Sequence, residues 1–177
     1  MGTAEEALPQ RSIWRKYILI FVCVGSRDYQ FNRLLKALDK LVAEKKVTEQ
    51  IVAQIGQSEY EPKNYEWHRF IDRDEFKNYQ NQADLIISHG GTGALIGALK
   101  LGKQVIAVPR LAKYGEHIDD HQTQISGILA KEGYLREVLD ISKLGDTIAL
   151  AYTDPIKKKY DKPSNVISII EKFIENI

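Results

Sequence analysis

The feature that most limits the fold of this chain is a run of apolar residues, 18–24, that ends directly at Gly25. A strand with one face in water alternates between apolar and polar residues, whereas this run is apolar at every position. Burial on both faces is typical of a strand inside a parallel sheet that helices cover on each side. The run therefore predicts the centre of a parallel α/β sheet.

The pattern of a strand followed by a helix repeats along the chain. Residues 29–45 carry apolar side chains at helical spacing, among them Phe31, Leu34, Leu35 and Leu38. We expect further strands at 50–55, 66–71, 84–88, 104–108 and 134–138, and further helices at 74–82, 92–101, 118–131, 142–152 and 163–177. This alternation predicts a Rossmann-like, doubly wound and mostly parallel sheet in one domain, 17–177, after an extension, 1–16.

Composition excludes several classes of protein. The formal net charge of the 177 residues is +1, which gives no sign of the basic surface that binds nucleic acid. The single cysteine, Cys23, cannot form an internal disulfide, as expected in a reducing cytoplasm. The longest apolar stretch, 17–24, is far shorter than the ~20 residues that cross a bilayer. We therefore expect a cytoplasmic protein that meets a membrane only through a partner or a peripheral face.

A glycine-rich turn, 88–93, follows one predicted strand and opens the next helix. In an open α/β sheet, ligands bind at the carboxyl ends of the strands, where this turn should lie. Glycines let a ligand approach the backbone, and the helix N-terminus offers free amides and a partial positive charge to a diphosphate. Thr92 can cap the helix and also donate its hydroxyl to an oxyanion. The alternative is a tight turn that needs glycine for packing alone.

A second polar cluster, 114–122, contains two histidines and three acids. His117 and His121 are four residues apart and would share a helix face, so a metal site is one interpretation. Asp119 or Asp120 in a first helical turn is also what helix capping selects. The third interpretation is a set of hydrogen bonds to a polyhydroxylated ligand such as a sugar.

Two further patterns bear on metal binding and on nucleophilic catalysis. The segment Asp72-Arg73-Asp74 matches an Asp-x-Asp pattern that holds metal-bound nucleotide sugars, but it lies where a helix should begin, and capping explains it better. No serine–histidine–acid or cysteine–histidine nucleophile can be assembled, because Ser26, Ser88 and the four histidines are scattered along the chain. The sequence therefore predicts neither a bound metal nor a nucleophilic side chain.

Three motifs in fixed order resemble a known family: Ile86-Ile87-Ser88-His89-Gly90-Gly91-Thr92-Gly93, Leu101-Gly102-Lys103-Gln104-Val105-Ile106-Ala107-Val108-Pro109 and Asp119-Asp120-His121-Gln122. The family is the donor-binding half of GT-B glycosyltransferases related to lipid II synthase. The chain most resembles its stand-alone form, the catalytic subunit of the eukaryotic dolichol-pathway N-acetylglucosaminyltransferase. Residues 108–117 look like the bacterial capsule and exopolysaccharide branch, as in a β-1,4-galactosyltransferase subunit that acts with an enhancer protein.

The resemblance implies roles for individual residues. It places Gly25 and Ser26 beside the donor diphosphate and the backbone of Phe70 and Ile71 against the uracil ring. Relatives often hold the ribose hydroxyls with a glutamate at the position of Gly97, so that contact is unassigned here. The diphosphate turn itself consists of Ser88, His89, Gly90, Gly91, Thr92 and Gly93, and the hydroxyls of the donor sugar are held by Asp120, His121 and Gln122.

The resemblance also implies a reaction. An acceptor hydroxyl attacks a UDP-sugar with inversion, and the helix N-terminus stabilises the departing UDP in place of a metal. UDP-sugar is the substrate and no cofactor is expected. The general base comes from the partner, from Glu116 or from His117.

The same likeness implies a partner. In this family it is a membrane-anchored acceptor-binding glycosyltransferase subunit that presents a polyprenol-linked acceptor at the inner face of the membrane. We expect the helix at 163–177 either to dock on this partner or to pack on its own sheet.

Two other functions fit the same sequence. A non-catalytic, regulatory subunit would bind a UDP-sugar and give no transfer with any partner. A sugar-nucleotide epimerase shares the fold, but those enzymes have two domains in one chain.

Overall fold

The structure is a computed structural model that describes residues 18–161. Its strands are β1 (Leu19–Cys23), β2 (Gln50–Gln54), β3 (Glu66–His68), β4 (Leu85–Ser88), β5 (Gln104–Ala107) and β6 (Arg136–Glu137). Its helices are α2 (Asn32–Ala43), α3 (Arg73–Gln82), α4 (Thr92–Lys100), α5 (His121–Lys131) and α6 (Leu144–Thr153), with 3₁₀ turns η2 (Ala112–Tyr114) and η3 (Ile141–Lys143). Within this part of the chain, none of the helices is long and apolar enough to cross a membrane.

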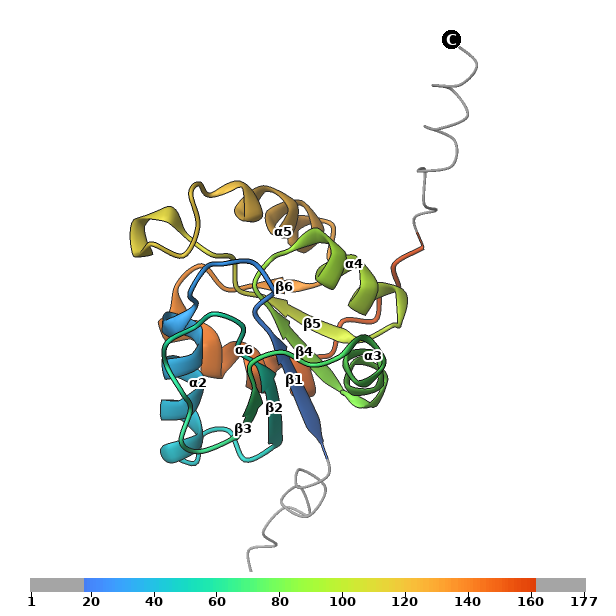
Figure 1. The fold of residues 1–177 in the computed structure, drawn as a ribbon. Helices are drawn as coiled ribbons and strands as arrows, with labels where there is room; N and C mark the ends of the chain where they lie inside the picture. The colour runs from blue at the N-terminus through green and yellow to red at the C-terminus, as the bar shows by residue number, and fades with distance from the viewer. Residues whose placement is uncertain (1–17, 162–177) are drawn as a thin grey trace, which may run out of the picture.

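The strands form one six-stranded sheet in the order β3-β2-β1-β4-β5-β6. Every neighbouring pair is parallel, which confirms the predicted Rossmann-like α/β fold (Figure 1). The predicted extension, 1–16, and the predicted helix at 163–177 lie outside the described residues.

Helices cover both faces of the sheet, and each face has its own hydrophobic core (Figure 1). Ile20 and Val22 of β1 belong to the core beneath α2 and α6. Phe21 and Cys23, the alternate residues, belong to the core beneath α3, α4 and α5. This explains why the run 18–24 is apolar at every position, because both faces of the strand are buried.

Helix α3 begins as the sequence predicts. The carboxylate of Asp72 accepts hydrogen bonds from the amides of Asp74 and Glu75, both at 2.9 Å. This confirms that Asp72 caps the helix, and it accounts for the Asp-x-Asp pattern without a metal.

Helix α5 begins at His121, three residues after its predicted start at 118. The preceding residues form a loop that two carboxylates hold in place. Asp119 Oδ1 accepts from the amide of His121 at 3.1 Å, and Asp120 Oδ1 accepts from the amide of Ala112 at 2.7 Å. Such side-chain bonds compete with helical hydrogen bonds, so the helix starts only after both aspartates.

The strand order reverses at β1 and β4, which are neighbours in the sheet. In their register Cys23 lies beside Ser88 at the carboxyl ends of both strands. The loops that begin near Gly25 and His89 therefore leave the sheet side by side. This is the switch point at which doubly wound folds bind their ligands.

Candidate functional site

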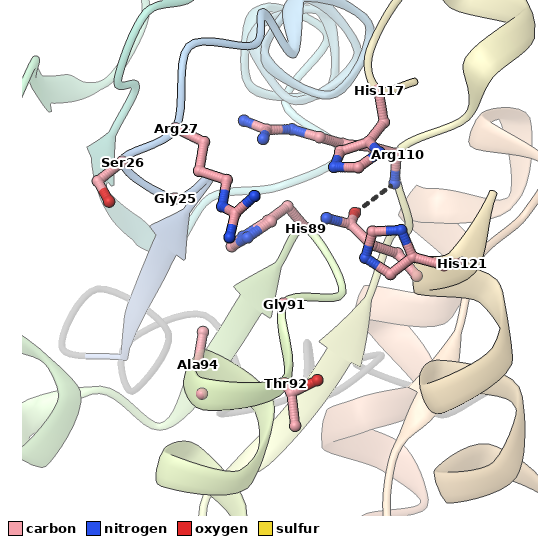
Figure 2. A pocket seen from close by; sticks show the side chains of 12 residues that line it. Gly25, Ser26, Arg27, His89, Gly91, Thr92, Ala94, Arg110, His117 and His121 are labelled. Atoms are coloured by element: carbon pink, nitrogen blue, oxygen red, sulfur yellow. Dashed lines mark hydrogen bonds between the residues drawn. The ribbon is translucent and has the colours of Figure 1, made fainter. Parts of the chain in front are cut away.

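A pocket of about 400 Å³ opens at the switch point (Figure 2). Three segments form its wall: the loop after β1, the turn that opens α4, and the loop that leads into α5. Its volume lies in the range of small-molecule sites. The residues that the sequence predicted and that line it are Gly25, Ser26, His89, Gly91, Thr92, Gly93, His117, His121 and Gln122.

Other predicted residues are not part of the pocket wall. Ser88 is fully buried at the end of β4. Gly90 has φ +90°, and a Cβ there would lie 3.3 Å from Cα of Pro109, so this glycine is needed for a close backbone approach. Asp120 uses its carboxylate on the amide of Ala112. These residues shape the turn and the loop and do not face the pocket.

The two residues predicted to meet the base lie outside the pocket wall. Phe70 and Ile71 follow β3, which is separated from β4 by β2 and β1 in the sheet. The Phe70 side chain is 50% exposed, and the amide of Ile71 donates to Oε1 of Gln54 at 3.1 Å. They are at the same carboxyl edge of the sheet as the pocket, and the prediction that their backbone meets a uracil ring stays a prediction.

The first turn of α4 faces the pocket, and no side chain caps this end of the helix. The N-cap residue is Gly91, and Thr92 is the first helical residue, so the prediction that Thr92 caps the helix is wrong. At α3, by contrast, Asp72 occupies the first free amides. Thr92, Gly93 and Ala94 line the pocket, and their amides and the helix dipole are available to an anion.

His89 lies over two of the glycines. A Cβ at Gly25 would be 2.8 Å from Nε2 of His89, and a Cβ at Gly91 only 2.5 Å, so a side chain at either position would have to displace the imidazole. Nδ1 of His89 lies 3.1 Å from the carbonyl oxygen of Cys23, which can only accept, so Nδ1 carries the proton. Burial, and then the charge of Arg110, lower the pKa of His89 to about 4. The imidazole is therefore neutral at pH 7 and acts as a wall of the pocket.

This neutral imidazole predicts a loss of stability in mild acid. In the unfolded chain a histidine binds a proton below about pH 6.5, whereas folded His89 stays neutral down to a pKa of about 4. Protonation thus favours the unfolded chain, and stability falls as the pH drops through this window. Urea unfolding at pH 7 and pH 5 should show that the wild type loses about 2 kcal/mol more than His89→Gln. Equal losses in both proteins would contradict the buried neutral imidazole.

Two arginines in the wall were not assigned from the sequence. Arg110 is 1% exposed, and Nη2 donates to the carbonyl oxygens of Val24 and Tyr29. Burial lowers the pKa of Arg110 to about 10, against the opposing charge of Glu116, so it stays charged at neutral pH. Its Nε has no hydrogen-bond partner among the described residues. In the sequence, the feature that indicates a role for Arg110 in the site is its position directly after Pro109, at the carboxyl end of a predicted strand.

Arg27 adds a second positive charge to the wall, from an exposed position in the loop after β1. No carboxylate lies among the residues that line the pocket within 18–161. Two guanidinium groups and an uncapped helix N-terminus make this a site for an anion.

A family model for the glycosyltransferase family 28 C-terminal domain matches residues 19–177. The chain belongs to this family. The match confirms the resemblance to the donor-binding domain of GT-B glycosyltransferases.

Relatives of this family 28 chain agree with the assignment. UDP-N-acetylglucosamine transferase subunit ALG13 of Mus musculus is 32% identical over 90 residues, which is 48% of this chain and 7% of that protein. The structure of MurG from Acinetobacter baumannii matches 92% of the chain and 50% of its own, at 18% identity and a TM-score of 0.63. The match to a solution structure of ALG13 covers 94% of this chain and 99% of that chain, at 17% identity and a TM-score of 0.58. The chain thus spans a small part of its curated relative, and the structural likenesses show the fold.

The two candidate bases of the family 28 site differ in their surroundings. Glu116 is fully buried, and its two carboxylate oxygens accept from Nε and Nη2 of Arg33 at 2.8 and 2.9 Å. The amide of Leu111 donates to the same carboxylate at 3.0 Å. We therefore remove Glu116 from the candidate bases and assign it to holding the loop. His117 lines the pocket, with its ring 4.6 Å from that of Tyr29, and stays a candidate.

Proposed function

We propose that this family 28 domain is the donor-binding and catalytic subunit of an inverting hexosyltransferase. It takes galactose or N-acetylglucosamine from a UDP-sugar and transfers it to a polyprenol-diphosphate-linked saccharide. The observation that carries this proposal is the cationic pocket at the uncapped N-terminus of α4. A diphosphate is the part of a UDP-sugar that such a pocket fits.

The wall of the pocket suggests how the donor lies. The diphosphate meets the amides of Thr92 and Gly93, with Arg27 and Arg110 on the β1 and β5 sides. The sugar lies toward His121 and Gln122 at the start of α5. Oε1 of Gln122 accepts from the amide of Arg110 at 3.1 Å, which leaves its Nε2 as a donor to a hydroxyl.

In the proposed reaction the acceptor hydroxyl attacks the anomeric carbon and UDP leaves with the bonding electrons. The helix N-terminus and the two arginines stabilise the charge that develops on the diphosphate, so this step does not need a metal. A base takes the proton from the hydroxyl, and His117 or a side chain of the partner supplies it.

The acceptor requires a second protein in this proposal. The named relative ALG13 is described as a subunit of a transferase, and MurG is twice as long as the matched region. We place the acceptor site on a membrane-anchored glycosyltransferase subunit, so that the chain works in the cytoplasm at the inner face of the membrane. Bacterial capsule or exopolysaccharide synthesis is the setting that residues 108–117 suggest.

Transfer assays test this proposal directly. We expect co-expression with the protein encoded by the neighbouring reading frame to give transfer from UDP-galactose or UDP-N-acetylglucosamine to membrane lipid acceptors, and the chain alone to give none. The control is the same pair with Gly91→Val in this chain. If UDP binds and no partner restores transfer, the regulatory-subunit alternative is correct. If the lone chain epimerises the donor, the epimerase alternative is correct.

A further inference from the structure

The loop before α5 brings three possible metal ligands together. Nitrogen atoms of His117 and His121 and a carboxylate oxygen of Asp119 all lie within 4.8 Å of one another. Asp119 Oδ1 is 3.3 Å from Nδ1 of His117 and also contacts Nδ1 of His121. The two histidines do not share a helix face, because His117 lies in the loop and His121 begins α5. The loop brings them together instead, with their ring centroids 4.7 Å apart.

The amide and the carboxylate of Asp119 both lie near one ring nitrogen of His117. The amide of Asp119 donates to Nδ1 of His117 at 3.4 Å, which requires a lone pair on that nitrogen. Asp119 Oδ1, a second acceptor, lies 3.3 Å from the same nitrogen. In the tautomer with a lone pair on Nδ1 of His117, this nitrogen and Asp119 Oδ1 can bind one cation between them; in the other tautomer Nδ1 donates its proton to Oδ1. The same oxygen also faces His121, so one cation could serve all three side chains.

We propose that His117, Asp119 and His121 bind a divalent first-row transition metal, with Zn²⁺ as the representative ion. Two imidazoles and one carboxylate are a ligand set that Zn²⁺ accepts. Ligand atoms about 2.0–2.2 Å from one tetrahedral ion lie roughly 3.5 Å apart. Asp119 Oδ1 and Nδ1 of His117, at 3.3 Å, are already close to this spacing, whereas the contact between Asp119 and His121 would have to open to admit the ion. The side chains of Asp119 and His121 are 55% and 54% exposed and can move, whereas His117 is 5% exposed and is fixed against Tyr29.

This ion would occupy the rim of the pocket formed by the loop before α5, whereas the proposed diphosphate site is at α4. His117 and His121 both line the pocket, and Figure 2 shows their rings close together on that side. Three protein ligands leave the fourth position of a tetrahedral ion open for water or a bound ligand. A bound ion would tie the loop to α5 and add positive charge to the pocket. With the ion bound, the base of the proposed reaction would come from the partner and the sugar would be held by Gln122. The binding measurement itself does not depend on transfer.

Other metal-binding side chains of the described chain do not compete with this cluster. Burial raises the pKa of the Cys23 thiol to about 11, so the thiolate that binds metal does not form at neutral pH. His89 is buried over the glycines and bonded to a carbonyl. His68 is paired with Glu66 at 3.1 Å and lacks a second imidazole. His68 is therefore the matched control, because it is also a partly exposed histidine beside an acid.

The test measures Zn²⁺ binding by calorimetry on the full chain, without donor or partner, after removal of any histidine tag and of residual metal by a chelator. We expect one equivalent of Zn²⁺ to bind to the wild type and to His68→Ala. His121→Ala and Asp119→Asn, both at exposed positions, should each weaken the affinity by at least ~10-fold. Visible absorption of the Co²⁺ form should report a four-coordinate site in the wild type and lose its intensity in both variants.

Two results would overturn the proposal. One is a wild type that binds Zn²⁺ no more tightly than His121→Ala, with circular dichroism showing both proteins folded. The other is a loss of affinity in His68→Ala that equals the loss in His121→Ala. Because UDP is absent from these measurements, a failure here leaves the transferase proposal standing, and a failed transfer assay leaves the metal site standing.

Discussion

Replacing Gly91 with valine is expected to weaken UDP binding by about 100-fold, or roughly 3 kcal/mol, while the domain stays folded. The backbone of Gly91 has φ −66° and ψ 127°, which any residue can adopt, so the change does not strain the turn. The new side chain, however, would begin 2.5 Å from Nε2 of His89. Either the imidazole moves or the valine fills the entrance to the N-terminus of α4, and both remove the diphosphate from the helix amides.

Calorimetry with UDP measures this effect, and Gly127→Ala is the matched control. Gly127 lies in α5, where a Cβ would be 3.8 Å from the carboxylate of Glu137, an ordinary contact. Its alanine variant should bind UDP as the wild type does and gain up to ~1 kcal/mol of stability, because alanine favours a helix. If circular dichroism shows Gly91→Val unfolded, Gly91→Ala gives the smaller change. Wild-type affinity in a folded Gly91 variant shows that this turn does not bind the diphosphate.

The sequence was sufficient to predict the sheet and the position of the pocket. Each strand in the centre of the sheet is buried on both faces, so its apolar run is visible without any knowledge of its neighbours. Gly25 and the turn at 88–93 follow two such runs, and parallel strands bring their carboxyl ends to one edge. Local pattern and the general rule for doubly wound sheets therefore place these two loops together.

The parts that could not be predicted depend on contacts between distant residues. The position of Arg110 after Pro109 indicates a place near the pocket, but its burial could not be predicted, because charged residues are rarely buried. Its burial requires the carbonyls of Val24 and Tyr29, which come from the loop after β1. The predicted start of α5 was wrong for a similar reason. The carboxylate of Asp120 accepts from the amide of Ala112 and does not cap its own helix. Helical spacing does not record such bonds.

The ion pair between Arg33 and Glu116 is another long-range contact, and it should be the most damaging polar contact to break. The two side chains come from α2 and from the loop before α5, and they are 12% and 0% exposed. Glu116→Ala would leave the guanidinium of Arg33 buried without its carboxylate. We expect a loss of about 3–5 kcal/mol in the free energy of unfolding, measured by urea denaturation.

A double-mutant cycle separates the ion pair from simple packing. Arg33→Met with Glu116→Leu removes both charges and keeps apolar volume. The double variant should therefore lose less free energy of unfolding than the sum of the losses in the two single variants. Glu44→Gln is the control, since the Lys40–Glu44 pair is exposed and should show no measurable change in the unfolding midpoint. Additive losses in the cycle would contradict the coupling.

Glu116 also accepts from the amide of Leu111, and Arg33 donates to the carbonyl of Pro109. Both contacts hold the loop that carries His117 and His121, so we expect the folded double variant to bind UDP more weakly than the wild type, although neither Arg33 nor Glu116 lines the pocket.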